Sequence, residues 1–186
     1  MATVRRRGAG ARKRAGAVPQ NKSGAGVSKP AGPAAQVFSR YRRVGLDTIC
    51  FIYHLSKHPL YTGITADLFA MIESGRLAAV TSSLALIEIL ARPKQVGHQA
   101  AADTYKVVLA TFPNLELRRA DIAITELAAE LRVRYRVTTP EAIHLATAII
   151  DGAEVFIGNT EPLRAVREIE VVLLDDVRAT LAKETA

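Results

Sequence analysis

The sequence predicts an α/β fold: a three-layer α/β/α sandwich with a central parallel sheet, preceded by a disordered basic tail. Short apolar runs alternate with longer amphipathic segments through most of the chain. Strands that alternate with helices pair in parallel through right-handed crossovers, and the helices then cover both faces of the sheet. Composition changes sharply near residue 40, so we expect a tail over residues 1–40 and one folded domain over 41–186.

The predicted tail carries the positive charge of the chain. Of the 186 residues, 1–43 include eleven Lys or Arg and no acid, whereas 44–186 include fourteen basic and eighteen acidic residues, a net charge of −4. Residues 1–35 contain almost no large apolar side chain, so burial cannot offset their chain entropy. Three roles stay open for this tail: a basic arm that binds nucleic-acid phosphates, an organelle transit segment, or an extension with little function.

Cysteine content and hydropathy indicate the compartment. Cys50 is the single cysteine, which excludes an intramolecular disulfide and favours a reducing environment. It lies in an apolar helix pattern, where a buried small side chain is expected. No apolar run approaches the roughly 18 residues of a membrane span. We therefore expect a cytoplasmic protein without a membrane partner.

Five strands are predicted where short apolar runs lie between turn-forming residues. They cover residues 42–47, 77–81, 115–118, 154–157 and 171–174. Helices are predicted where apolar residues recur every three or four positions. They cover residues 48–55, 64–74, 83–91, 99–112, 122–136, 139–151 and 162–168, with a last short helix after residue 174.

Residues that cap or break helices mark the ends of these elements in order. His58-Pro59 follows the first helix and Gly75 closes the second. Ser82 or Ser83 can cap the third helix, which we expect to stop at Arg92-Pro93 because proline lacks a backbone donor. Proline also follows the fourth helix, and Asp-Gly ends the helix that begins at Thr139-Pro140.

Four acids fall where this fold would bring them together. Asp47 ends the first strand, Glu88 lies on the helix after the second strand, Glu141 lies in the first turn of a later helix, and Glu161 follows the fourth strand. In an open parallel sheet the ligand crevice lies beyond the carboxyl ends of the strands. Crowded carboxylates repel one another, and a divalent cation removes that penalty. Mg²⁺ or Mn²⁺ suits such oxygen ligands and can activate water for phosphodiester cleavage.

Each acid also has a purely structural interpretation. Asp47 can cap the first helix, and Glu88 can pair with Arg92 one turn later. Glu141 can form a capping box with Thr138, and Glu161 would favour the dipole of its own helix. None of the four is specific alone, so their arrangement along the α/β pattern carries the prediction.

Four segments resemble the PIN domain family, of the kind found in VapC-type toxins of bacterial toxin–antitoxin pairs. They are GLDTICFIYHLSKHPLY, VTSSLALIEIL, TTPEAIHLATAII and VFIGNTEPLRAV, and they span about residues 43–175. The resemblance implies a PIN-like fold and a metal-dependent ribonuclease, often a homodimer, that acts on RNA and is inhibited by a cognate antitoxin protein.

The resemblance also implies roles for single residues. It assigns the catalytic metal site to Asp47, Glu88 and Glu141, with supporting polar roles for Thr48, Ser82 and Asn159. The chain departs from the family pattern twice: Glu141 stands where Asp is usual, and Thr160 stands where a fourth acid often follows Asn159. Glu161, one residue later, is a further candidate ligand, so either one or two metal ions remain compatible with the sequence.

The function expected from these observations is a Mg²⁺- or Mn²⁺-dependent endoribonuclease that hydrolyses RNA with metal-activated water. The alternative is a catalytically degenerate PIN-like module that binds RNA or protein, which the missing fourth acid favours. A third interpretation, a phosphoacceptor or small-molecule domain using Asp47, does not account for Glu88 and Glu141. His144, three residues after Glu141, is expected to be a packed or rim histidine rather than a ligand.

Overall fold

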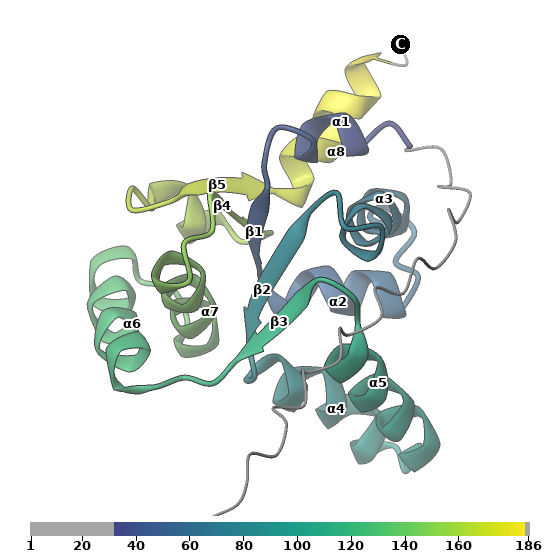
Figure 1. Cartoon of the computed structure of the whole chain (residues 1–186), viewed down its shortest axis with the longest axis horizontal. Coiled ribbons are helices and arrows are strands. Elements are labelled where there is room, and N and C mark those ends of the chain that lie inside the picture. The colour runs from purple at the N-terminus through teal and green to yellow at the C-terminus, as the bar shows by residue number, and fades with distance from the viewer. Residues whose placement is uncertain (1–31, 185–186) are drawn as a thin grey trace, which may run out of the picture.

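A five-stranded parallel sheet forms the centre of the protein. In the computed structural model, which describes residues 32–184, the strand order is β3-β2-β1-β4-β5 and every adjacent pair is parallel (Figure 1). The strands are β1 Arg43–Leu46, β2 Ala78–Ser82, β3 Leu115–Arg118, β4 Val155–Gly158 and β5 Glu170–Leu173. The chain moves outward from β1 to β3 and then returns to the other side of β1 with β4. This reversal creates a switch point between β1 and β4, where ligands bind in such sheets.

Helices cover both faces of the sheet, which confirms the predicted three-layer sandwich. Helices α6 and α7 lie on one face, and α2, α3 and α8 lie on the other (Figure 1). The helices are α1 Ala35–Phe38, α2 Thr48–Leu55, α3 Thr62–Glu73, α4 Ala85–Gln95, α5 Gln99–Thr111, α6 Ile122–Tyr135, α7 Thr139–Ile150 and α8 Leu174–Glu184, with a 3₁₀ helix, η1, at Glu161–Ala165.

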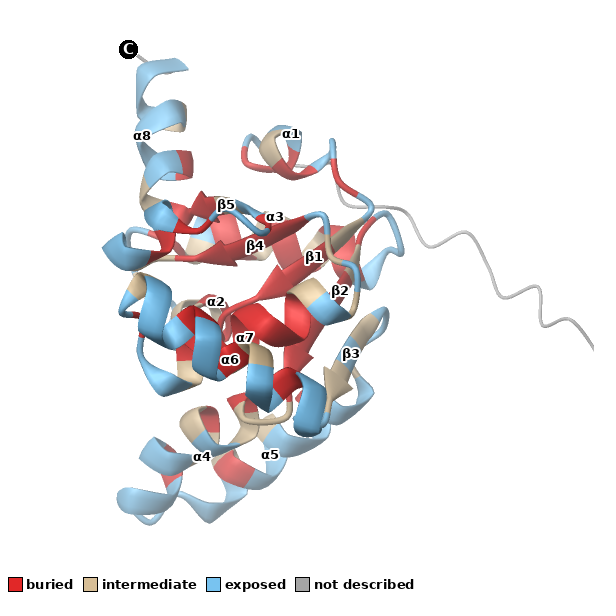
Figure 2. Ribbon diagram, turned by 90° about the vertical axis from the view of Figure 1, so that its left-hand side faces the viewer, coloured by how far each residue is buried: buried red, intermediate tan, exposed pale blue. Residues whose placement is uncertain are grey.

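The side chains of the central strands alternate between two hydrophobic clusters, because successive residues of a strand point to opposite faces. In β4, Val155 and Ile157 belong to the cluster under α2 and α3, whereas Phe156 belongs to the cluster under α6 and α7. Strands β1 and β4 are buried almost throughout, and seven of the twelve residues of helix α7 are buried (Figure 2). This burial explains why the central strands read as continuous apolar runs in the sequence.

Gly45 allows helix α7 to approach the sheet closely. A Cβ atom at this position would lie 2.2 Å from the Cβ of Ala148 and 3.1 Å from a ring carbon of Phe156. Even the smallest side chain would therefore push α7 away from β1. Since α7 carries Glu141 and His144, the missing side chain at Gly45 also sets how close these two residues come to the end of β1.

Helix α1 lies within the residues predicted to form the tail. Phe38 is fully buried in the cluster under α3, and the amide of Ala34 donates a hydrogen bond of 3.0 Å to the Asp67 carboxylate. The chain from residue 32 onward therefore packs against the domain, because a single large aromatic side chain supplies the apolar area that the preceding residues lack. The disorder predicted for residues 1–31 lies outside the described residues.

Helix α4 is longer than the sequence predicts. It continues through Pro93 to Gln95, although the sequence analysis ends it at Ala91. Proline removes one backbone donor, but Pro93 is buried in the last turns of the helix, where its ring lines an apolar hollow with Ile89 and Val96. Within residues 32–184, no helix is long and apolar enough to span a membrane.

We predict that Gly45→Ala destabilises the protein by about 1–3 kcal/mol, the usual result of overpacking a filled core. The added methyl group would overlap the side chain of Ala148 and displace α7. Urea unfolding followed by circular dichroism measures the change.

The matched control is Gly63→Ala in α3, where a Cβ atom would meet nothing within 4 Å. This variant should be unchanged or more stable, by at most about 1 kcal/mol, because alanine favours a helix over glycine. Equal stability of the two variants would contradict the close approach of α7.

Candidate metal site at the carboxyl ends of β1, β2 and β4

Asp47 lies at the switch point between β1 and β4. Its backbone amide donates to the carbonyl oxygen of Ile157 in β4 at 2.9 Å, which extends the pairing of the two strands by one step. Its Oδ1 atom accepts a hydrogen bond of 3.2 Å from the Ile49 amide, so Asp47 caps α2 as the structural interpretation predicts. The same residue therefore begins α2 and places a carboxylate at the site expected for a ligand.

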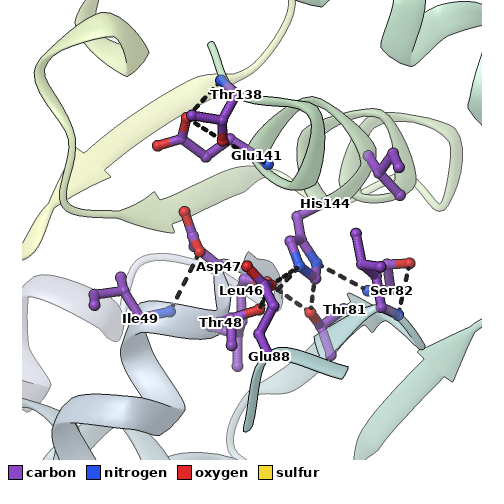
Figure 3. A network of polar contacts seen from close by, with 12 residues as sticks. Leu46, Asp47, Thr48, Ile49, Thr81, Ser82, Glu88, Thr138, Glu141 and His144 are labelled. Atoms are coloured by element: carbon purple, nitrogen blue, oxygen red, sulfur yellow. Dashed lines mark hydrogen bonds and ion pairs between the residues drawn. The ribbon is translucent and has the colours of Figure 1, made fainter. Parts of the chain in front are cut away.

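The carboxylate of Asp47 is buried, with only 7% of the residue exposed. Burial raises its pKa above the ordinary value. The nearby His144 and the Ile49 amide lower this pKa, whereas the negative charges of Glu141 and Glu88 raise it further. Glu88 and Glu141 are thus close enough to Asp47 to affect its carboxylate electrostatically (Figure 3).

Glu88 reaches the site from the first turn of α4. Its Oε2 atom accepts a 2.6 Å hydrogen bond from the hydroxyl of Thr48 and lies 3.1 Å from Nε2 of His144. Partial burial acts to raise the pKa of Glu88, but the bonds from His144 and Thr48 outweigh it and the pKa is lowered. Glu88 is therefore held as a carboxylate by these partners, rather than by the Arg92 pair considered from the sequence.

Glu141 occupies the N-terminus of α7 and forms the predicted capping box with Thr138. Its Oε2 atom accepts hydrogen bonds of 2.8 Å from both the amide and the hydroxyl of Thr138. Its Oε1 atom accepts a 2.6 Å bond from the hydroxyl of Thr160. Thr160, which replaces the expected fourth acid, thus orients Glu141 instead of adding a charge.

His144, which the sequence predicts to be a packed or rim histidine rather than a ligand, lies beside Thr48 and Glu88. It is packed, with 1% of the residue exposed, but it also contacts three polar side chains. Its Nε2 atom lies 2.9 Å from the Thr48 hydroxyl, and its Nδ1 atom lies 3.1 Å from the Thr81 hydroxyl. The sequence feature that could have indicated these contacts is a histidine one turn after Glu141 on a largely apolar helix.

Three further residues that the sequence suggests for the metal site make other contacts in the structure. The Oγ atom of Ser82 accepts from the Leu84 amide at 3.2 Å, so Ser82 shapes the turn before α4. The side chain of Asn159 accepts from the Asp175 amide at 2.8 Å and ties the end of β4 to α8. The side chain of Glu161 is 80% exposed and pairs with Arg164, so the structure does not bring it to Asp47.

The donor set is suited to a hydrated divalent cation. Among residues 32–184, no three His, Cys, Asp or Glu side chains converge closely enough to enclose a metal ion directly. Mg²⁺ does not need such a cage, because it usually takes one or two carboxylates and keeps several water molecules. Asp47, with Glu88 and Glu141 beside it, offers oxygen ligands of the kind that Mg²⁺ and Mn²⁺ prefer.

Comparison with known proteins is consistent with this geometry. The sequence model of the PIN domain matches residues 44–169, a span that includes Asp47, Glu88 and Glu141. No curated protein matches. A structure of VapBC2 from Rickettsia felis bound to a DNA fragment from their promoter is similar, with a TM-score of 0.56 and 15% identity over 70% of this chain and 98% of that chain.

A second similar structure is a toxin–antitoxin complex from Klebsiella pneumoniae. Its TM-score is 0.53, and its identity is 22% over 71% of this chain and 97% of that chain. At such low identities the two likenesses establish the fold, whereas the family model also matches the sequence around the acidic residues.

We predict that Asp47→Asn raises the melting temperature of the metal-free protein at neutral pH. The raised pKa means that charging Asp47 is less favourable in the folded than in the unfolded state. The stability that the protonated form provides is therefore present below the unfolded pKa, about 3.9, and is lost as the pH rises through the folded pKa. Calorimetry from pH 3 to pH 8 should show the gain disappear at low pH.

The control is Asp176→Asn, for which the expected change in melting temperature has the opposite sign. Hydrogen bonding from Arg164 lowers the pKa of Asp176, so removing this charge should lower the melting temperature at neutral pH. A melting temperature of Asp47→Asn at or below that of the unmodified protein at pH 7 would show that burial does not disfavour the charged form of Asp47.

Proposed function

The chain belongs to the PIN domain family, and on this premise we propose that it is a metal-dependent endoribonuclease, the toxin of a toxin–antitoxin pair. The observation that carries the proposal is the buried carboxylate of Asp47 at the switch point, with Glu88 and Glu141 close enough to raise its pKa. A buried acid that other acids surround is unfavourable unless a cation balances it. The site therefore has the charge and the ligand type for Mg²⁺ or Mn²⁺.

Different residues of this chain would have different roles at such a site. Asp47 would hold the ion directly, with Glu88 and Glu141 as ligands or as acceptors for its water molecules. Thr48 and Thr160 orient these two acids by hydrogen bonds of 2.6 Å each. When bound, the cation activates water and stabilises the charge that develops on the scissile phosphate.

The RNA backbone requires positive charge near this acidic site. The C-terminal part of α6 carries arginines and leads through Val137 into the capping box of Glu141. Arg132 and Arg136 are exposed there, whereas Arg134 pairs with Glu168. We assign the approach of the RNA phosphates to this end of α6, which lies next to the ligand-bearing end of α7.

An antitoxin protein is the proposed partner, since both similar structures described above belong to toxin–antitoxin systems. An apolar hollow of about 300 Å³ lies beside Glu88, between α2 and the α4–α5 pair. Ile52 and Val96, which line it, are 38% and 46% exposed, which provides apolar area for a partner chain. We also expect the homodimer that is common in the family.

The second candidate function is a binding module that has lost catalysis. The observation in its favour is that Glu141 is fully engaged by Thr138 and Thr160, and that Thr160 stands where the family often has an acid. Such a module would bind RNA or protein in the presence of a chelator and would show little affinity for Mn²⁺.

We predict that Asp47→Asn reduces metal-dependent cleavage of single-stranded RNA by at least about a hundredfold. A metal ion supplies several kcal/mol of transition-state stabilisation, and each 1.4 kcal/mol corresponds to about a factor of ten. The assay compares Mg²⁺, Mn²⁺ and EDTA with the purified full-length chain.

Glu161→Gln is the matched control for this assay. It also removes one carboxylate near the end of β4, but from a side chain that is 80% exposed, so cleavage should stay within about twofold of the unmodified protein. Cleavage that survives both Asp47→Asn and EDTA would refute the proposed function. RNA binding without cleavage in either metal, together with no Mn²⁺ binding, would favour the binding module.

Expression in bacteria tests the toxin assignment separately. We predict growth arrest with the unmodified chain and none with Asp47→Asn at equal protein levels, because arrest would require the metal site. Equal growth arrest by the two forms would show that any toxicity does not come from RNA hydrolysis at Asp47. Relief of the arrest by the product of a neighbouring gene would identify the antitoxin.

A further inference from the structure

His144 connects four chain segments that converge on the acidic site. It projects from α7 and contacts Thr48 at the start of α2, Thr81 and the Ser82 amide in β2, and Glu88 on α4 (Figure 3). Its side chain is completely buried, whereas that of Glu88 is 31% exposed. A buried imidazole with partners on both nitrogens has a defined orientation, so it can fix the position of a more exposed neighbour.

The contact with Glu88 requires a proton on Nε2. A carboxylate oxygen has no hydrogen to donate, so the 3.1 Å contact between Nε2 and Oε2 is a hydrogen bond only when Nε2 carries the proton. The Thr48 hydroxyl donates its one hydrogen to the same Oε2 atom at 2.6 Å and therefore accepts from Nε2 at 2.9 Å. His144, Thr48 and Glu88 thus form a closed triangle of hydrogen bonds.

The other ring nitrogen anchors this triangle to the sheet. Nδ1 accepts the amide of Ser82 at 3.4 Å and lies 3.1 Å from the hydroxyl of Thr81, which donates its one hydrogen to the Leu46 carbonyl at 2.8 Å. Leu46 directly precedes Asp47 in the chain. The position of Glu88 is therefore linked through His144 to the Ser82 amide in β2, and the adjacent Thr81 binds the end of β1, directly before Asp47.

Both hydrogen bonds to Glu88 use Oε2, and among the described residues Oε1 has none. We propose that His144 is a positioning residue that binds Oε2 of Glu88 and so directs Oε1 toward the cation held by Asp47. This role of His144 adds to the proposed function and rests on it for the presence of the cation. The hydrogen bonds between His144 and Glu88 can be tested independently of any activity. Residues that orient metal ligands typically change metal affinity or activity by 10- to 100-fold when they are replaced.

The first test compares His144→Gln with His144→Asn. The amide nitrogen of glutamine can reach the position of Nε2 and keep the bond to Glu88, whereas that of asparagine lies near Nδ1 and cannot reach Glu88. Isothermal titration of the full-length protein with Mn²⁺ should show affinity within about threefold of the original for Gln and about 10- to 100-fold weaker for Asn. Both variants bury an amide, so melting temperatures control for general loss of packing.

Equal affinities for the two variants, at equal melting temperatures, would overturn the positioning role. Failure of the unmodified protein to bind Mn²⁺ would instead refute the proposed function. In that case, ¹⁵N NMR of the His144 imidazole in the metal-free protein tests the hydrogen bond to Glu88 by itself. The expected result is a proton on Nε2 and a shift of that resonance in Glu88→Gln but not in the exposed control Glu161→Gln; a bare Nε2 would overturn the inference.

Discussion

The parallel pairing of β1 with β4 creates the place on which the site depends. These strands come from opposite ends of the folded chain, and the backbone bond from Asp47 to Ile157 continues their register beyond the last paired residues. Because β1 connects to helices on one face and β4 follows a helix on the other, the chain diverges at the carboxyl ends of these two strands, where Asp47 lies. The missing side chain of Gly45 then lets α7 lie close enough to add Glu141 and His144.

Burial of acidic groups at this switch point requires compensation, and the chain supplies it mainly with hydroxyl groups. Thr48 binds Glu88, while Thr138 and Thr160 bind Glu141. Neutral donors of this kind hold carboxylates in place without neutralising them, so the site keeps its negative charge. Asp47 accepts only the Ile49 amide among the described residues, and burial raises its pKa, so the proposed function assigns the cation to Asp47 first.

The sequence predicted most of the fold because apolar periodicity and breaking residues are local signals. It placed helix α2 at its observed bounds and predicted the capping box of Thr138 and Glu141, since both depend on residues within one turn. It ended α4 too early, because the favourable burial of Pro93 depends on neighbours distant in sequence. It placed Ala35–Phe38 in the tail for the same reason: Phe38 is buried only because α3 and the sheet lie beneath it.

The sequence by itself determined the α/β class and the order of the elements, because these follow from residue type and spacing, and its resemblance to the PIN domain family pointed to Asp47, Glu88 and Glu141. Only the tertiary structure decided how each acid is oriented. The bond from Thr160 to Glu141 and the buried contacts of His144 join residues on different elements, and only the structure shows that Glu161 is exposed. The direction of a side chain depends on which donors the packed helices bring within about 3 Å, and hydrogen bonds of that length cannot be inferred from local pattern.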